Sequence, residues 1–315
     1  MSEEVEITKN VPIFVFHSKS VSGIEFDEKE NIIYIDTDPY YEQIKPENRT
    51  FYFKELLFNG IHDEDYTTFV REASEKAKRE NISIVPTVFP TFSSNLTKPE
   101  SIEDKAGWYM FDTTIIDSNT YLNATRVVFG STYVLQQFLN TPANIVLLSS
   151  SPGQFAGRNK GGKGCIFNST ANIAKNIVIK NIKFKVVILD LTKSYSHGLQ
   201  DIFSDSIKVF ILSLHQKETN LFFSGDFHER GPNKNFINLP YNARDATIDD
   251  LKTLIKFGFW NIKTDISTFF VIMIDSDTSP ELGTYVKEFI GPRKKILIVE
   301  GNHDNYSSFA NNLFG

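Results

Sequence analysis

The chain has 315 residues, of which 41% are hydrophobic, and a formal net charge of −6. This size suffices for a full core, and the acidic balance gives no general attraction to nucleic acid or to a membrane, so we expect neither as a partner. A single cysteine, an acidic start without a signal peptide and the lack of a transmembrane segment favour an intracellular location, cytoplasmic or nuclear.

Short apolar runs alternate with helical patterns along the chain. The pattern predicts helices at 63–80, 118–139, 170–179, around Leu199, at 246–257 and at 280–289, with Asp63, Ser118 and Asp245 as N-caps. It predicts strands at 12–17, 144–148, 185–190, 208–213, 269–274 and 295–300. Strands separated by helices indicate a parallel sheet that helices cover on both faces.

Ligands of open parallel sheets bind beyond the carboxyl ends of the strands. Four loops leave the predicted strands at these ends, at 149–164, 190–197, 275–279 and 300–306. They contain most of the unusual side chains, namely Gln154, Phe155, Lys163, Thr192, Ser194, His197, Asp275, Asp277, His303 and Asp304. We therefore expect any functional site at this edge of the sheet.

Three segments carry a family resemblance: Ser-Pro-Gly-Gln-Phe-Ala at 151–156, Gly-Cys-Ile-Phe-Asn-Ser at 164–169, and the run 187–200. In order and spacing they resemble the histone deacetylase and acetylpolyamine amidohydrolase superfamily of zinc hydrolases. Weaker similarities extend to 56–74, 108–121, 224–240 and 296–301. The resemblance implies an α/β fold of the arginase/deacetylase type. This is a three-layer αβα arrangement around a mostly parallel sheet of roughly eight strands, in one domain over 1–315.

The resemblance also shows where the zinc ligands of that superfamily would lie. An Asp, a His two residues later and a second Asp hold the metal, and these positions are Thr192, Ser194 and Asp277 here. Two hydroxyls and one carboxylate suit zinc poorly, so we expect no zinc and no other cofactor at this former metal site. The superfamily's buried monovalent-cation site is retained at Asp190 and Ser213, so a structural potassium or sodium ion is expected there.

The acid–base residues implied by the resemblance have changed as well. The paired histidines correspond to Gln154 and Phe155, neither of which titrates near neutral pH, and the carbonyl-polarising tyrosine corresponds to His303. We therefore predict a catalytically inactive member, a pseudoenzyme retained for a structural or protein–protein interaction role, with a protein partner or a homo-oligomer. Asp277 without its metal needs a charge partner, for which Lys163 is the candidate, followed by His303 or by hydrogen bonds from Thr192 and Ser194.

Two other functions remain open. One is a metal-dependent amidohydrolase with a site rearranged around His197, His303, Asp275, Asp277 and Asp304, although their spacing matches no metal motif. The other is a protein that binds a polyamine or an acyl-lysine without hydrolysing it.

Several other sequence features favour plain structural interpretations. Cys165 is expected to be a buried inert thiol, and the basic run 157–164 lacks the Gly-Lys-Ser/Thr ending of a phosphate-binding loop. The Phe-rich segments 221–223 and 257–260 are the candidates for an exposed apolar patch. Frequent Phe, Lys, Asn and Ile are typical of an AT-rich genome, such as that of a protist or a large DNA virus.

Overall fold

The computed structural model describes residues 13–22, 32–45, 48–49, 60–90, 96–140, 144–217, 225–301 and 305–315. Eight strands form one sheet in the order β2-β1-β3-β8-β7-β4-β5-β6, and every neighbouring pair is parallel. Their bounds are β1 (Ile13–His17), β2 (Ile32–Asp36), β3 (Asn144–Ser149), β4 (Lys185–Asp190), β5 (Val209–Gln216), β6 (Phe236–Tyr241), β7 (Thr268–Ile274) and β8 (Lys295–Glu300). The predicted parallel sheet is therefore confirmed.

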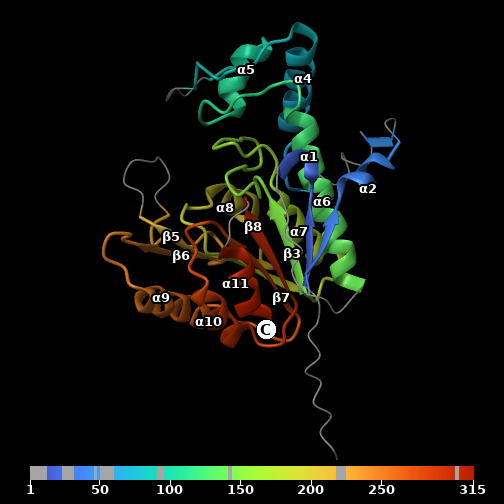
Figure 1. The fold of residues 1–315 in the computed structure, drawn as a ribbon. Coiled ribbons are helices and arrows are strands. Elements are labelled where there is room, and N and C mark those ends of the chain that lie inside the picture. Colours follow the sequence, from blue (N-terminus) through green and yellow to red (C-terminus); the bar gives the residue numbers. More distant parts are fainter. Residues whose placement is uncertain are drawn as a thin grey trace, which may run out of the picture.

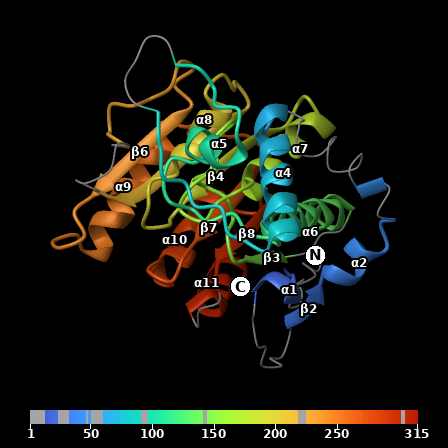
Figure 2. The ribbon, with the colours of Figure 1, turned by 90° about the horizontal axis from the view of Figure 1, so that it is seen from above.

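Helices cover both faces of the sheet. Figure 2 shows α7 (Ser169–Lys180) and α8 (His197–Phe203) on one side of the strands, and α10 (Glu281–Ile290) and α11 (Asn305–Phe314) on the other. The side chains of the central strands point alternately to the two faces, and both faces are buried. This burial explains why the strands read as continuous apolar runs rather than as alternating patterns.

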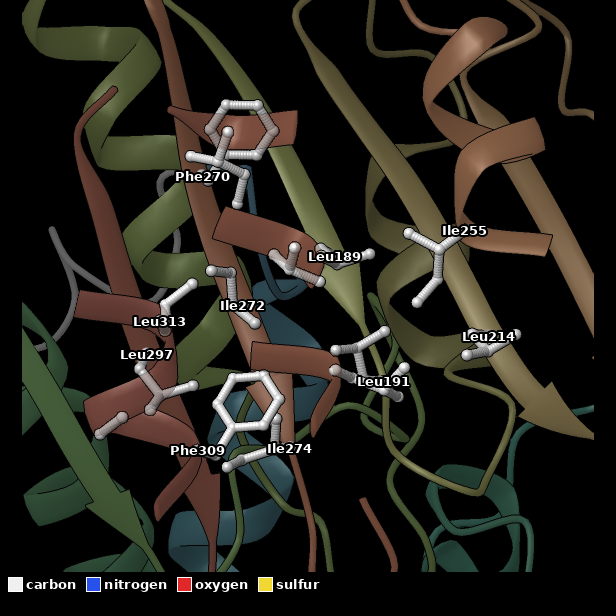
Figure 3. Close-up of a cluster of buried hydrophobic side chains, with 14 of the residues drawn as sticks. Leu189, Leu191, Leu214, Ile255, Phe270, Ile272, Ile274, Leu297, Phe309 and Leu313 are labelled. Atoms are coloured by element: carbon white, nitrogen blue, oxygen red, sulfur yellow. The ribbon is translucent and has the colours of Figure 1, made fainter. Parts of the chain in front are cut away.

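Two hydrophobic clusters fill the spaces between the layers. Phe270, Ile272 and Leu297 of the sheet pack against Phe309 and Leu313 of α11 on one face (Figure 3). That cluster also includes residues of α9 (Ile248–Trp260) and α10. On the other face, strand side chains pack against α6 (Thr120–Asn140), α7 and α8.

A third cluster forms beyond the carboxyl edge of the sheet. There α4 (Glu64–Glu80) and α5 (Ile102–Tyr109) pack against each other and against the first turns of α6 (Figure 1). Two short helices, α1 (Lys19–Ser22) and α2 (Asp38–Glu42), follow β1 and β2. Every helix among the described residues is too short or too polar to cross a lipid bilayer.

Two expected helix caps differ in the structure. Helix α6 begins at Thr120, so the residue that precedes it is Asn119 and not Ser118. The N-cap of α9 is Thr247 and not Asp245, because the Thr247 hydroxyl accepts a hydrogen bond from the amide of Asp250 at 3.3 Å. The Asp250 carboxylate in turn accepts the Thr247 amide at 2.8 Å. This reciprocal capping box outweighs the nearby aspartate, whose carboxylate accepts a hydrogen bond from Asn242.

Candidate functional site

Four strands that are consecutive in the sheet, β3, β8, β7 and β4, bring their carboxyl ends to one place. The loops that follow them are joined by side-chain hydrogen bonds. Gln154 after β3 donates to Glu300 at the end of β8, with 2.8 Å between Nε2 and Oε2. The amide of Lys193 after β4 donates to Asp275 after β7 at 2.8 Å. The expected gathering of polar residues at this edge is therefore present.

Asp190, the last residue of β4, lies in a buried polar cluster. Its Oδ1 accepts hydrogen bonds from the amide and the hydroxyl of Thr192, at 3.0 and 2.7 Å. Its Oδ2 accepts the hydroxyls of Ser196 and Ser213, the latter at 3.3 Å. Burial raises the pKa of this carboxyl to about 7 in spite of these donors. The expected potassium or sodium ion at Asp190 and Ser213 stays a prediction.

The three positions that the resemblance assigned to the metal do not come together as a ligand set. The Asp277 carboxylate is 47% exposed and lies 2.6 Å from the ammonium of Lys193. Thr192 directs its hydroxyl to Asp190, and only the backbone carbonyl of Ser194 contacts Thr192, at 3.3 Å. An ammonium beside the one carboxylate, together with two neutral hydroxyls, is a donor set that does not fit zinc.

The partner of Asp277 is not the residue that the sequence indicated. Lys193 holds the carboxylate, and the pKa of this lysine is raised mainly by the hydrogen bond to Asp277. The Nζ of Lys163 lies instead over the ring of Phe155, 4.6 Å from its centroid, and its amide donates to Asp112 at 2.6 Å. The backbone of Lys163 has a φ of 49°, in the left-handed region.

Gln154 and Phe155 occupy quite different surroundings although they are adjacent. Gln154 is fully buried, and it holds Glu300, whose pKa is raised by burial. Phe155 stacks on the ring of His197 at a centroid distance of 5.6 Å, and Phe111 meets the same imidazole edge-on at 4.9 Å. Burial, followed by the charge of Lys163, lowers the pKa of His197 to about 4, so the ring is neutral at neutral pH.

These rings form one wall of a cavity of about 550 Å³, which we call the aromatic cavity. Its buried surface comes from aromatic side chains, two glycines and Gln200, and its exposed rim includes the carboxylates of Asp201 and Glu229 and the ammonium of Lys160. The lining residues are Phe111, Phe155, Gly157, Asn159, Lys160, Tyr195, His197, Gly198, Gln200, Asp201, Glu229, Gly231 and Phe236. The volume is in the usual range for a small-molecule site.

Close backbone packing shapes the cavity. At Gly198, at the start of α8, an added Cβ would lie 2.5 Å from the carbonyl carbon of Phe155. The amide of Leu199 donates to the carbonyl of Gln154 at 3.2 Å, which fixes α8 against the loop after β3. A side chain at Gly198 would separate these two segments and with them the rings of Phe155 and His197.

Sequence reasoning missed His62, which organises the loop behind the cavity. Its Nδ1 lies 2.7 Å from the carbonyl oxygen of Gly157, and its Nε2 accepts the amide of Asn168 at 2.9 Å. Asn168 is also the N-cap of α7. The buried imidazole therefore connects the 157 loop to the start of a core helix, and no sequence motif marks this role.

The rearranged metal site that the sequence left open does not assemble in the described residues. Its His197 lies between aromatic rings, and no group of three His, Cys, Asp or Glu side chains in that part of the chain could hold a metal ion. His303 and Asp304 lie outside the described residues. Cys165 is buried, as expected, and burial raises the pKa of its thiol to about 11.

Comparison with known proteins supports the family resemblance. Residues 32–258, well over half of the chain, match the histone deacetylase domain. Acetylpolyamine amidohydrolase 2 of Pseudomonas aeruginosa is 27% identical over 158 residues, which cover 49% of this chain and 46% of the relative. The acetylpolyamine amidohydrolase of Mycoplana ramosa is 27% identical over 213 residues, which cover 63% and 62%. The chain thus spans roughly half to three fifths of these relatives' lengths.

The fold is also that of solved deacetylase-type structures. An acetylpolyamine aminohydrolase from Burkholderia pseudomallei matches with a TM-score of 0.71 at 15% identity, over 96% of this chain and 97% of that one. A histone deacetylase homologue from Aquifex aeolicus matches with a TM-score of 0.65 at 15% identity, over 96% and 82%. The expected arginase/deacetylase fold is therefore confirmed.

These comparisons contradict one prediction from the sequence. The chain was expected not to be an enzyme, because the acid–base and metal positions have changed. The two relatives described above, each 27% identical to the chain, are named acetylpolyamine amidohydrolases, and the matched domain is the histone deacetylase domain. A changed set of residues at those positions is not evidence that activity is lost, so the prediction of a pseudoenzyme is wrong on this finding. The chain belongs to the histone deacetylase domain family.

Proposed function

We propose that this chain hydrolyses the amide bond of acylated amines, with the substrate bound in the aromatic cavity. The observation that supports this is the arrangement of the cavity wall, with aromatic side chains in its buried part and carboxylates at its exposed rim. Phe155, Tyr195 and Phe236 are buried, whereas Asp201 and Glu229 are exposed at the rim. A neutral acyl-amide end suits the buried aromatic part, and a free ammonium suits the carboxylates.

The contacts of Lys163 support the same orientation. Its primary ammonium lies over the Phe155 ring at 4.6 Å, so a cation of this kind is accommodated at the edge of the aromatic wall. The rim carries the carboxylates of Asp201 and Glu229, which are the groups that would pair with a free ammonium of the substrate. The named relatives act on acetylpolyamines, which combine such an amide with free ammonium groups.

His197 is the side chain in the cavity that is suited to carry a proton. Its ring lies between Phe111 and Phe155, and its lowered pKa keeps it neutral at neutral pH, so it would act as a base, weaker than an exposed histidine. The proposal assigns no step to Thr192, Ser194 or Asp277, since their donor set does not fit the zinc of the family.

The test measures acetate release from acetylated polyamines and from an acetyl-lysine peptide by the purified full-length chain. His197→Phe retains a ring in the aromatic wall and removes the nitrogens, so kcat should fall with little change in KM. Glu229→Gln removes a rim charge, so KM for the cationic substrate should rise by about fivefold, which corresponds to about 1 kcal/mol. Glu281→Gln, on α10 and away from the cavity, is the matched control. The proposal fails if wild-type protein releases no acetate above the uncatalysed rate.

A further inference from the structure

The edge of the sheet formed by the amino ends of its strands carries protruding apolar side chains. Ile182, Ile207 and Ile266 are 79%, 69% and 98% exposed. Each lies in the turn that leads into a strand, and these strands are β4, β5 and β7, which are neighbours in the order β7-β4-β5. Three of the most exposed apolar side chains therefore come from three adjacent turns.

Backbone hydrogen bonds hold these turns side by side. The amide of Lys185 donates to the carbonyl of Ser267 at 3.3 Å, and the amide of Val186 donates to that of Lys208 at 2.9 Å. Trp260, the last residue of α9, is 73% exposed and begins the segment that leads to Ile266. We call Ile182, Ile207, Trp260 and Ile266 the apolar edge.

Basic side chains surround the apolar edge, in contrast to the chain as a whole with its net charge of −6. The ammonium of Lys256 lies 5.1 Å from the centre of the Trp260 ring. The acidic residues in these turns are Asp265, whose carboxylate is paired with Lys185 at 3.3 Å, and Asp205, whose carboxylate lies 3.8 Å from Arg158. The other basic residues of these turns and of the turn before β8 are Lys180, Lys183, Lys208, Lys263, Arg293, Lys294 and Lys295.

We propose that the apolar edge docks on an anionic lipid surface. A second copy of the chain would place like charges opposite each other, so this positive surface favours an acidic partner. The isoleucines project from three separate turns. A lipid layer accepts such single aliphatic side chains without a matching pocket, while its headgroups pair with the flanking lysines. The acidic average of the sequence, which predicted no membrane partner, conceals this local surface.

The apolar edge and the aromatic cavity are formed by different residues. The apolar edge lies at the amino ends of β4, β5 and β7, whereas the cavity is lined by residues of the loops after β3 and β4, by α8 and by the segment that leads into β6. This inference does not depend on the proposed hydrolysis.

The experiment is sedimentation of the full-length chain with vesicles of phosphatidylcholine alone and with added phosphatidylserine. We expect binding only to the anionic vesicles, weakened by salt. Ile182→Ser, Ile207→Ser and Ile266→Ser combined should weaken it by at least about a hundredfold. Lys180→Gln with Lys183→Gln should weaken it by roughly 25-fold, at about fivefold for each positive charge lost.

The matched control replaces Ile82, Val88 and Ile115 by Ser, because these side chains are also exposed but lie beyond the opposite edge. It should bind vesicles as wild type does. Equal binding by the two triple variants, or absence of binding to anionic vesicles, would overturn the proposal. Light scattering tests the alternative that a second copy covers this surface. A wild-type dimer that becomes monomeric when Ile182, Ile207 and Ile266 are replaced by Ser would support that alternative and overturn the proposal. Thermal melting checks that each variant is folded.

Discussion

His62 allows a quantitative test of how the loop behind the cavity is held. The imidazole is only 4% exposed. A backbone amide can only donate, so the amide of Asn168, 2.9 Å away, fixes Nε2 as an acceptor. The proton must then lie on Nδ1, which donates to the carbonyl oxygen of Gly157 at 2.7 Å. The folded protein therefore holds this histidine in its neutral form, and burial lowers its pKa from 6.5 to about 4.

The pH dependence follows from the sign of this shift. The folded-state pKa lies below the unfolded value of 6.5, so the unfolded chain binds more protons between these two values. The contribution of His62 to the free energy of unfolding is complete above pH 6.5 and is lost as the pH falls toward 4. At about 1.4 kcal/mol per unit, the loss between pH 7.5 and pH 5 is about 2 kcal/mol.

Urea unfolding of wild type and of His62→Gln at these two pH values measures the effect. The variant should be less stable near neutral pH by about 1–3 kcal/mol, because the Asn168 amide or the Gly157 carbonyl loses part of its hydrogen bonding. Between pH 7.5 and pH 5, the free energy of unfolding of the variant should fall by about 2 kcal/mol less than that of wild type. His228→Gln, in an exposed loop, is the control and should follow wild type. An equal acid-induced loss in wild type and in His62→Gln would show that His62 is not held neutral.

Three further predictions concern the site and the loops around it. Protein purified without chelator should contain much less than one zinc per chain, because an ammonium pairs with Asp277; stoichiometric zinc by elemental analysis, lost in Asp277→Ala, would contradict this. The Cys165 thiol, with its pKa raised to about 11 by burial, should react with a thiol reagent at neutral pH only after unfolding; rapid labelling of the native protein would contradict its burial. Gly153→Ala should cost more than about 3 kcal/mol in urea unfolding, because φ is +84° and a Cβ would lie 2.2 Å from a backbone oxygen. Gly164→Ala, at a similar φ of +74° but in open space, should cost only about 1–2 kcal/mol, and equal costs would refute the steric argument.

Two of the buried strands could be predicted to the residue, and the edge strand β2 could not be predicted. The predicted bounds of β4 and β8 agree with the structure, because strands buried on both faces are continuous apolar runs that end where polar loops begin. In α5, Gly107 weakens the helical signal, yet a Cβ there would lie 1.7 Å from the carbonyl oxygen of Val88, so tertiary packing requires the glycine.

The location of the site could be predicted, but its internal pairing could not. Parallel strands carry their loops to one edge whatever the loops contain, which is why Gln154, Asp190 and Asp277 were expected at the same edge. Which ammonium pairs with Asp277 depends on the path of an irregular loop, where side chains follow no fixed period. Lys193 lies between Thr192 and Ser194, and the resemblance implied no chemical role for it.

The parallel arrangement of the strands brings the loops after their carboxyl ends to one edge of the sheet, and it brings the turns before their amino ends to the other. Net charge is a sum over the chain, but a partner meets only the residues that the fold places together. Ile182 and Ile266 are 84 positions apart in the sequence, and each alone is an ordinary exposed isoleucine. They become a surface because β4 and β7 are neighbours, and strand order cannot be read from a list of elements. The absence of a membrane partner, argued from the average charge, is therefore the sequence-based expectation that the fold gives most reason to test.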